Sequence, residues 1–251
     1  AVPGRHEGEV YAPIVENPFL SAYENPLSTF GIDVDTAAYT NVSRFIRNGE
    51  LPPPDAVRLE ELINFFGYDY PQPPNGEPFS ITVDAANCPW NPGHQLVRIG
   101  LQGRAVPRDQ RPASNLVFLV DVSGSMEAAN KLPLVKTGLG LLTQQLDERD
   151  RVAIVTYSEV AVKRLDATSA ANKPAILGVI DSLVANGSTN GARGLELAYQ
   201  TAVENFVSQG TNRVILCTDG DFNVGTKSDE ELVALIEERA RTKVFFSVFG
   251  F

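Results

Sequence analysis

The stretch Asn115-Leu-Val-Phe-Leu-Val-Asp-Val-Ser-Gly-Ser125 joins a run of apolar residues to three side chains that carry oxygen. The apolar part is short and continuous, which is typical of a strand that is buried on both faces. Asp121, Ser123 and Ser125 follow at its exit. A carboxylate and two hydroxyls, with no histidine or thiolate among them, suit Mg²⁺, Mn²⁺ or Ca²⁺ rather than zinc or copper. The stretch therefore predicts half of a cation site.

The other half is expected at the ends of other strands, because ligands of open α/β sheets bind outside the carboxyl ends of the strands. Thr189 in Asn186-Gly-Ser-Thr-Asn190 and Asp219 in Cys217-Thr-Asp-Gly-Asp221 are the candidates. Taken singly, Asp or Ser after a strand often only caps a helix, and Thr-Asp-Gly is an ordinary turn. Their joint placement at three strand ends favours a metal site.

From residue 115 onward, apolar runs alternate with amphipathic segments. This alternation predicts an α/β fold with a mainly parallel, doubly wound sheet and helices on both faces. The expected strands span residues 115–121, 151–157, 213–218 and 244–250, with a short antiparallel edge strand at 160–165. Helices are expected around residues 132–146, 173–184 and 195–206, and Ser228-Asp-Glu-Glu231 predicts the start of another.

The part before residue 113 has a weaker pattern. Residues 1–28 contain four prolines and no sustained period, so an extended arm is expected. Apolar spacing predicts two short helices in residues 36–48 and 59–66. Alternation in residues 79–83 and 97–101 predicts an antiparallel hairpin of half-buried strands, with Trp90 in its connection. A small α+β extension of this kind has little core, so we expect it to pack against the rest of the chain.

Composition fits a globular protein: 43% of the 251 residues are hydrophobic, enough for a substantial core. The formal net charge of -10 argues against a nucleic-acid partner, since phosphate backbones repel an acidic protein. No apolar run approaches the ~20 residues that span a bilayer. The chain begins with Ala1 rather than Met, which is expected if a targeting segment has been removed. Cys217 is expected to be a small core residue rather than the disulfide partner of Cys88.

An enzyme is the competing class of protein. The only histidines, His6 and His94, lie upstream of residue 113, which makes a Ser-His-Asp triad improbable. A nucleophilic Asp121 of a phosphotransferase would want an acidic residue at position 123, where this chain has serine. Neither a phosphate-binding Gly-x-x-x-x-Gly-Lys-Ser/Thr loop nor a Gly-x-Gly-x-x-Gly motif occurs. We therefore expect no enzymatic activity, and a metal-dependent hydrolase is the weakest alternative.

The three loops, in this order, resemble the metal-ion-dependent adhesion site of von Willebrand factor A (VWA) domains, over residues 113–251. Four upstream stretches extend the resemblance to bacterial envelope proteins that carry a VWA-associated N-terminal segment: Phe30-Gly-Ile-Asp-Val-Asp-Thr36, Pro52-Pro-Pro-Asp-Ala-Val-Arg58, Cys88-Pro-Trp-Asn-Pro92 and Val97-Arg-Ile-Gly-Leu-Gln-Gly103. The implied division is an arm (1–28), a VWA-associated segment (29–112) and a VWA domain (113–251). The VWA domain is expected to be incomplete at its C-terminus, since such domains continue through another helix and strand.

The resemblance also implies a function. Ser123, Ser125 and Thr189 would bind the ion directly or nearly so, whereas Asp121 and Asp219 would act partly through water. The expected ion is Mg²⁺, with Mn²⁺ or Ca²⁺ as alternatives, and the expected partner is a protein that offers an Asp or Glu carboxylate to the ion. The implied location is extracytoplasmic, in the bacterial cell envelope. The main alternative is a passive structural or assembly domain with a vestigial metal site, which would bind its partner equally well in a chelator.

Overall fold

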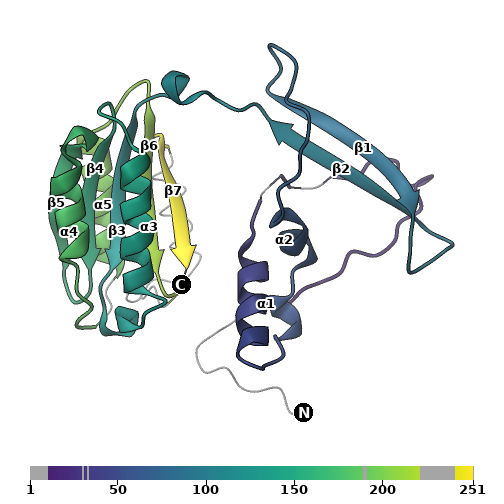
Figure 1. Ribbon diagram of the computed structural model, residues 1–251, viewed down its shortest axis with the longest axis horizontal. Helices are drawn as coiled ribbons and strands as arrows, with labels where there is room; N and C mark the ends of the chain where they lie inside the picture. Colours follow the sequence, from purple (N-terminus) through teal and green to yellow (C-terminus); the bar gives the residue numbers. More distant parts are fainter. Residues whose placement is uncertain (1–10, 30, 33, 189–190, 221–240, 251) are drawn as a thin grey trace. The chain divides into compact units, whose positions relative to one another are not determined.

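The computed structural model describes residues 11–29, 31–32, 34–188, 191–220 and 241–250. The chain divides into two compact units, Ala1–Ala105 and Val106–Phe251 (Figure 1). None of the helices in the described ranges has the length and apolar character needed to cross a membrane. Both cysteines are buried free thiols, and burial raises the pKa of Cys217 to about 12. Cys217 is thus a core residue, as predicted.

The second unit is built on a five-stranded sheet with the order β5-β4-β3-β6-β7. The strands are β3 (Ser114–Asp121), β4 (Arg151–Tyr157), β5 (Ala161–Ser169), β6 (Thr211–Thr218) and β7 (Val244–Gly250). The central strand β3 runs parallel to both of its neighbours, and β7 is parallel to β6. Only the pairing of β5 with β4 is antiparallel. The mainly parallel sheet with an antiparallel edge strand is therefore confirmed.

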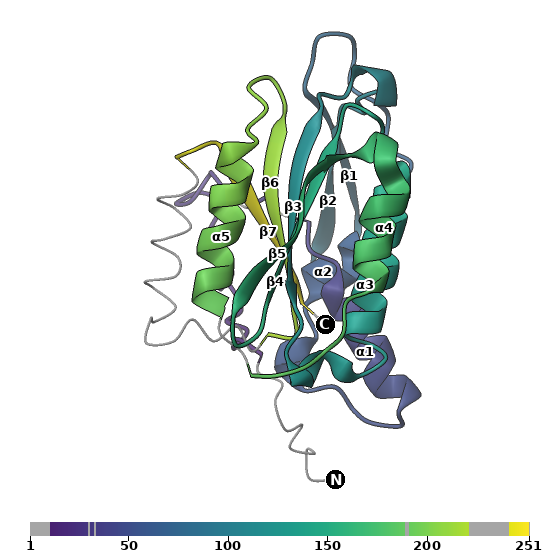
Figure 2. The ribbon, with the colours of Figure 1, turned by 90° about the vertical axis from the view of Figure 1, so that its left-hand side faces the viewer.

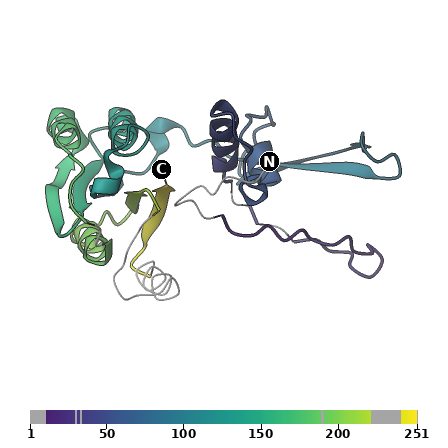
Figure 3. The same ribbon diagram turned by 90° about the horizontal axis from the view of Figure 1, so that it is seen from below.

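Helices cover both faces of this sheet, as Figures 2 and 3 show. Alternate residues of β3 point to opposite faces, because the side-chain period of a strand is two. Phe118 lies in a core with α3 (Leu132–Gln145) and α4 (Lys173–Asp181), whereas Leu119 lies in a second core with α5 (Gly191–Glu204). The short 3₁₀ turns of this unit are η2 (Arg108–Gln110), η3 (Gly124–Glu127) and η4 (Ala170–Asn172). The helix predicted to begin at Ser228 lies outside the described residues.

The first unit holds the two short helices and the hairpin that the sequence predicts. Its elements are α1 (Ala37–Arg47), η1 (Pro54–Ala56), α2 (Leu59–Asn64), β1 (Phe79–Asn87) and β2 (Gln95–Gly103). The two strands pair antiparallel, and Trp90 lies in their connection. A turn at residues 22–24 is the single regular feature of the described arm, residues 11–29. The carboxylate of Glu61 accepts a hydrogen bond from the backbone N–H of Ala38, which ties α2 to the start of α1.

The expectation that the hairpin strands are half-buried through their apolar side chains is wrong. Phe79, Ile81 and Val83 are 51%, 59% and 61% exposed. The other face of the hairpin is the one that is covered, because the ring of Tyr70 lies where a Cβ of Gly100 would be. Alternation in a sequence indicates that a strand has two different faces, but which face is covered depends on the segment that packs there.

Candidate metal centre

The first loop of the candidate site follows the central strand of the sheet. Asp121 is the last residue of β3 and is fully buried. Its carboxylate accepts a hydrogen bond of 2.8 Å from the backbone N–H of Ser123, which holds the turn after the strand. The hydroxyl oxygens of Ser123 and Ser125 are 3.1 Å apart. The motif Asp-x-Ser-x-Ser thus folds into one compact group of oxygens.

The second loop connects α4 to α5, so the expectation that it lies at a strand end is wrong, but two backbone hydrogen bonds join it to the first loop. The N–H of Asn186 donates to the carbonyl of Val122 at 2.7 Å, and the N–H of Gly124 donates to the carbonyl of Gly187 at 2.9 Å. Gly187 has a φ of 83°, a backbone conformation that favours glycine. Thr189, the predicted ligand of this loop, lies outside the described residues. Gly187, two positions before Thr189, is nevertheless hydrogen-bonded to Gly124 in the turn between Ser123 and Ser125.

The third loop begins where β6 ends, beside the end of β3. Thr218 donates its hydroxyl to the second carboxylate oxygen of Asp121 at 3.5 Å and accepts the N–H of Gly220 at 3.3 Å. Gly220 has a φ of 94°, so the Thr-Asp-Gly turn needs glycine there. The side chain of Asp219 is only 3% exposed, and one of its oxygens is 2.8 Å from the ammonium nitrogen of Lys131.

Tyr157 ends β4 directly beside Asp121 in the sheet register and is fully buried. Its pKa is raised above the ordinary value, first by burial and then by the negative charge of Asp121, and Asp219 acts in the same direction. Burial and both negative charges disfavour the ionised phenolate, so Tyr157 is held as a neutral phenol. The backbone carbonyl of Tyr157 also accepts the N–H of Val122, which fixes the first loop against β4.

The donor set fits a hard divalent cation. The side chains that gather here offer carboxylate and hydroxyl oxygens, which Mg²⁺ and Ca²⁺ prefer. No ion pair to the buried Asp121 occurs among the residues that the structure describes, so a cation at this point would offset the cost of burying its charge. Within the same ranges no three His, Cys, Asp or Glu side chains gather. A metal site at this point would therefore have to use hydroxyl and backbone oxygens as well as the carboxylates.

The structure adds three residues to the neighbourhood of the predicted ligands: Lys131, Tyr157 and Thr218. Thr218 and Tyr157 end strands that were predicted, and strand ends that meet at one edge of a sheet could have indicated them. Lys131 stands six positions after Ser125, and a lone lysine before a helix indicates only a solvated charge. Its pairing with Asp219, 88 positions away, depends on the fold.

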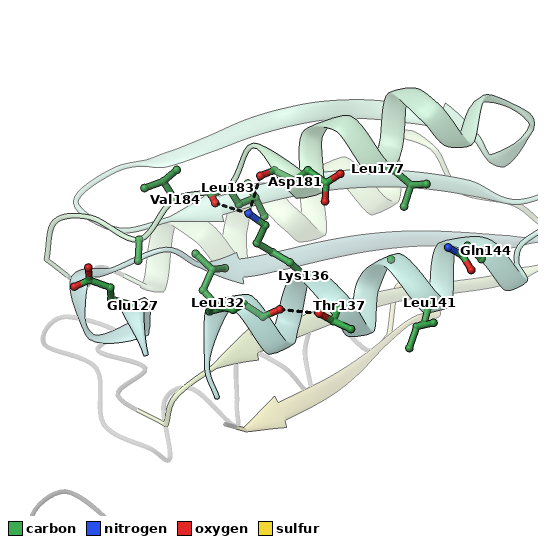
Figure 4. Close-up of a pocket in the computed structure, with 13 residues that line it drawn as sticks. Glu127, Leu132, Lys136, Thr137, Leu141, Gln144, Leu177, Asp181, Leu183 and Val184 are labelled. Carbon is green, nitrogen blue, oxygen red and sulfur yellow. Dashed lines mark hydrogen bonds between the residues drawn. The ribbon is translucent and has the colours of Figure 1, made fainter. Parts of the chain in front are cut away.

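A groove lies next to this centre, between α3 and α4, with a volume of about 670 Å³ (Figure 4). Lys136 crosses it and donates to the carbonyls of Asp181 and Leu183 at 2.6 Å and 3.1 Å. None of the described candidate ligands lines this groove. It is separate from the oxygen cluster.

Two family models match the chain: one described as von Willebrand factor over residues 5–98, and one described as von Willebrand factor type A domain over residues 116–221. Fold, loop geometry and both matches agree, so the chain belongs to the von Willebrand factor type A family. Domains of this family are generally interaction modules and commonly bind divalent metals.

Among curated proteins, the chain is 42% identical over 247 residues to the uncharacterized protein YfbK of Escherichia coli (strain K12). That alignment covers 96% of this chain but 43% of YfbK. The chain is also 30% identical over 129 residues to the uncharacterized protein sll0103 of Synechocystis, which covers 51% of this chain and 30% of that protein. The chain thus spans less than half the length of these relatives.

Among solved structures, a von Willebrand factor type A protein from Catenulispora acidiphila is 18% identical, with a TM-score of 0.47 over 68% of this chain and 40% of the other. BatB from Bacteroides thetaiotaomicron is 20% identical, with a TM-score of 0.46 over 55% of this chain and 66% of the other. With TM-scores below 0.5, these likenesses add nothing to what the strand order already shows.

Proposed function

We propose that the protein is a protein-binding module whose adhesion or assembly depends on a divalent metal ion, Mg²⁺ before Mn²⁺ or Ca²⁺. The observation that supports the proposal most is the joining of the loops after the adjacent strands β3 and β6 to the loop between α4 and α5, with Asp121 buried there beside two serine hydroxyls 3.1 Å apart. The proposed ligands are Asp121, Ser123, Ser125, Thr189 and Asp219. Asp121 and Asp219 would act partly through water.

The chain's own groups set what such a site can do. Two carboxylates carry two negative charges, so they do not over-neutralise a divalent ion, and the three hydroxyls add none. A bound divalent ion would supply a positive centre that accepts oxygen ligands. A partner's Asp or Glu carboxylate would complete the oxygen shell by replacing water. Gly124 and Gly220 keep the turns free of side chains where that carboxylate would approach.

The proposal includes a bacterial, extracytoplasmic location in the cell envelope, which rests on the resemblance of the upstream stretches to envelope proteins. It also includes the absence of enzymatic activity, because the described centre offers oxygens to an ion and no histidine to act as a base. A passive assembly domain with the same loops is the alternative. The two differ in whether partner binding needs the ion.

The first test uses Asp219→Ala against a partner recovered from native extract in Mg²⁺. The substitution removes one carboxylate but leaves the buried residues of β6 in place, so the domain should keep its circular dichroism and cooperative melting. Partner binding should fall to the level of wild type in chelator. The matched control is Asp166→Ala on the edge strand β5, where the carboxylate is 83% exposed, and it should bind like wild type. Metal-independent binding by a folded Asp219→Ala protein would favour the passive domain.

A second test needs no partner. A ligand that binds only the folded chain stabilises it by about 2.7 kcal/mol when its concentration is a hundred times its dissociation constant. We expect millimolar Mg²⁺ or Mn²⁺ to raise the melting temperature of wild type modestly, and to leave that of Asp219→Ala nearly unchanged. If Mg²⁺, Mn²⁺ and Ca²⁺ all fail to shift the melting of wild type, no ion occupies the site.

A further inference from the structure

The two acidic residues of the candidate centre have different surroundings. Asp121 meets neutral donors, the N–H of Ser123 and the hydroxyl of Thr218. Asp219 instead forms an ion pair with Lys131, with nitrogen and oxygen 2.8 Å apart. The side chain of Asp219 is 3% exposed and that of Lys131 is 27% exposed. One carboxylate of the centre is therefore already held by a cation that belongs to the chain.

The surroundings of Lys131 allow its ammonium both to pair with the Asp219 carboxylate and to leave it. Its backbone is fixed immediately before α3, where its N–H donates to the carbonyl of Ala128 at 2.9 Å. Its side chain is a flexible stem with a compact ammonium at the tip, and part of that side chain reaches solvent. Releasing the ammonium would require no movement of the helix.

A lysine ammonium and a divalent ion compete when they need the same carboxylate. Two positive charges held close together near a protein surface repel each other, and a divalent ion repels the ammonium twice as strongly as a monovalent ion at the same distance. An ion that binds Asp219 must therefore displace the ammonium or bear this repulsion. If a monovalent ion replaces the ammonium, the positive charge beside Asp219 stays the same. If a divalent ion replaces it, that charge rises by one.

We infer that Lys131 is an internal competitor for the metal: its ammonium occupies Asp219 in the metal-free protein, leaves when a divalent ion binds, and thereby lowers the affinity for that ion. The inference rests on the proposed function, since it concerns the same site. It makes Lys131 a residue that sets metal affinity without being a ligand. A surface lysine that only stabilises a turn would leave metal affinity unchanged.

The decisive variant is Lys131→Met, which keeps the length of the stem and removes the charge. Binding of Mn²⁺ and Mg²⁺ is measured by calorimetry at low ionic strength. We expect Lys131→Met to bind at least about tenfold more tightly than wild type, and Lys131→Arg to stay within about threefold of it. The matched control is Lys163→Met, which removes a lysine from another aspartate pair, Lys163 and Asp166 at 2.7 Å, on the far edge strand. It should bind like wild type.

The outcomes separate the two proposals. If wild type binds and Lys131→Met binds no more tightly than Lys163→Met, the competitor is rejected and the proposed function stands. If neither wild type nor Lys131→Met binds an ion, the proposed function fails and the competitor with it. A purely structural role would lower the melting temperature of metal-free Lys131→Met and leave the dissociation constant unchanged.

A measurement on wild type covers the case in which the variant fails to fold. An amine-acylating reagent is applied with Mg²⁺ and with chelator, and modification of each lysine is followed by mass spectrometry. Lys131 should react faster in Mg²⁺ because its ammonium is released, relative to Lys163 as the internal reference. Equal or slower reaction of Lys131 in Mg²⁺ would overturn the inference.

Discussion

At the scale of single residues, a densely hydrogen-bonded group lies at the end of the sheet opposite to the candidate centre. Arg111 donates to both oxygens of Asp150 at 2.9 Å and 2.6 Å, and to Asp147 at 3.2 Å. Asp150 is fully buried and also accepts the backbone N–H groups of Ser114 and Asp147. Arg111, Asp147 and Asp150, here called the Arg111 cluster, tie the segment before β3 to the turn before β4. The cluster thereby fixes the register of these two strands.

We predict that Asp150→Ala lowers the free energy of unfolding by about 3 kcal/mol, because it removes the buried carboxylate from Arg111, which keeps, among the described residues, only Asp147 as an ion-pair partner, and leaves two backbone donors without their acceptor. Urea denaturation at neutral pH measures the change. The exposed neighbour Asp166 is the control, since Asp166→Ala should cost less than about 1 kcal/mol. Equal stability of the two variants would show that the Arg111 cluster contributes nothing to the free energy of unfolding.

The pKa shifts within the Arg111 cluster predict how the stability of the fold depends on pH. Burial raises the pKa of Asp150, but hydrogen bonds from Arg111, Asp147 and Ser114 outweigh it, and the pKa is lowered overall. The pKa of Asp147 is lowered too, chiefly by the hydrogen bond from Arg149. A lowered folded-state pKa gives stability that is complete above the unfolded value of about 3.9 and is lost as pH falls below it. Between pH 5 and pH 3, melting temperature should fall more in wild type than in Asp150→Ala. Parallel curves would contradict this.

At the scale of elements, most of the second unit could be predicted from sequence. Runs such as residues 116–120 and 214–216 are apolar throughout because both faces of a central strand are covered, and this pattern depends on no distant residue. The exposed apolar face of the β1–β2 hairpin could not be predicted, because burial depends on what packs there. The Lys131–Asp219 pair was missed for the same kind of reason: two loops meet only after folding.

The contact of α5 with the sheet gives a test at this scale. A Cβ at Gly194 would lie 2.9 Å from the Cβ of Tyr157 and 3.2 Å from the Cδ1 of Leu119, closer than packed atoms allow. Gly194→Ala should push α5 away from the sheet and cost about 1–3 kcal/mol. Gly138→Ala is the matched control, because Gly138 lies in α3 and a Cβ there would meet nothing within 4 Å. It should gain up to about 1 kcal/mol from the better helix propensity. If both variants change stability alike under thermal denaturation, close packing at Gly194 is not what requires glycine.

At the scale of the whole molecule, the two units differ in how much core they have. The described part of the first unit fully buries few hydrophobic side chains: Ala38, Phe45, Ala56 and Cys88. Many of its large hydrophobic side chains are exposed, among them Leu51, Leu59, Trp90 and Val97. The second unit has two cores, one on each face of its sheet. Small domains need a well-filled core to offset the loss of chain entropy on folding, and the first unit buries little apolar surface for this purpose.

We therefore predict that residues 1–105 expressed alone do not fold cooperatively, whereas residues 106–251 do. The physical reason is the difference in buried apolar area, which contributes about 25 cal/mol per Å² and is small in the first unit. Amide spectra and urea denaturation of the two fragments provide the measurement, with the full chain as the reference. Dispersed amide signals and a cooperative transition in the 1–105 fragment would show instead that the first unit is an independent domain.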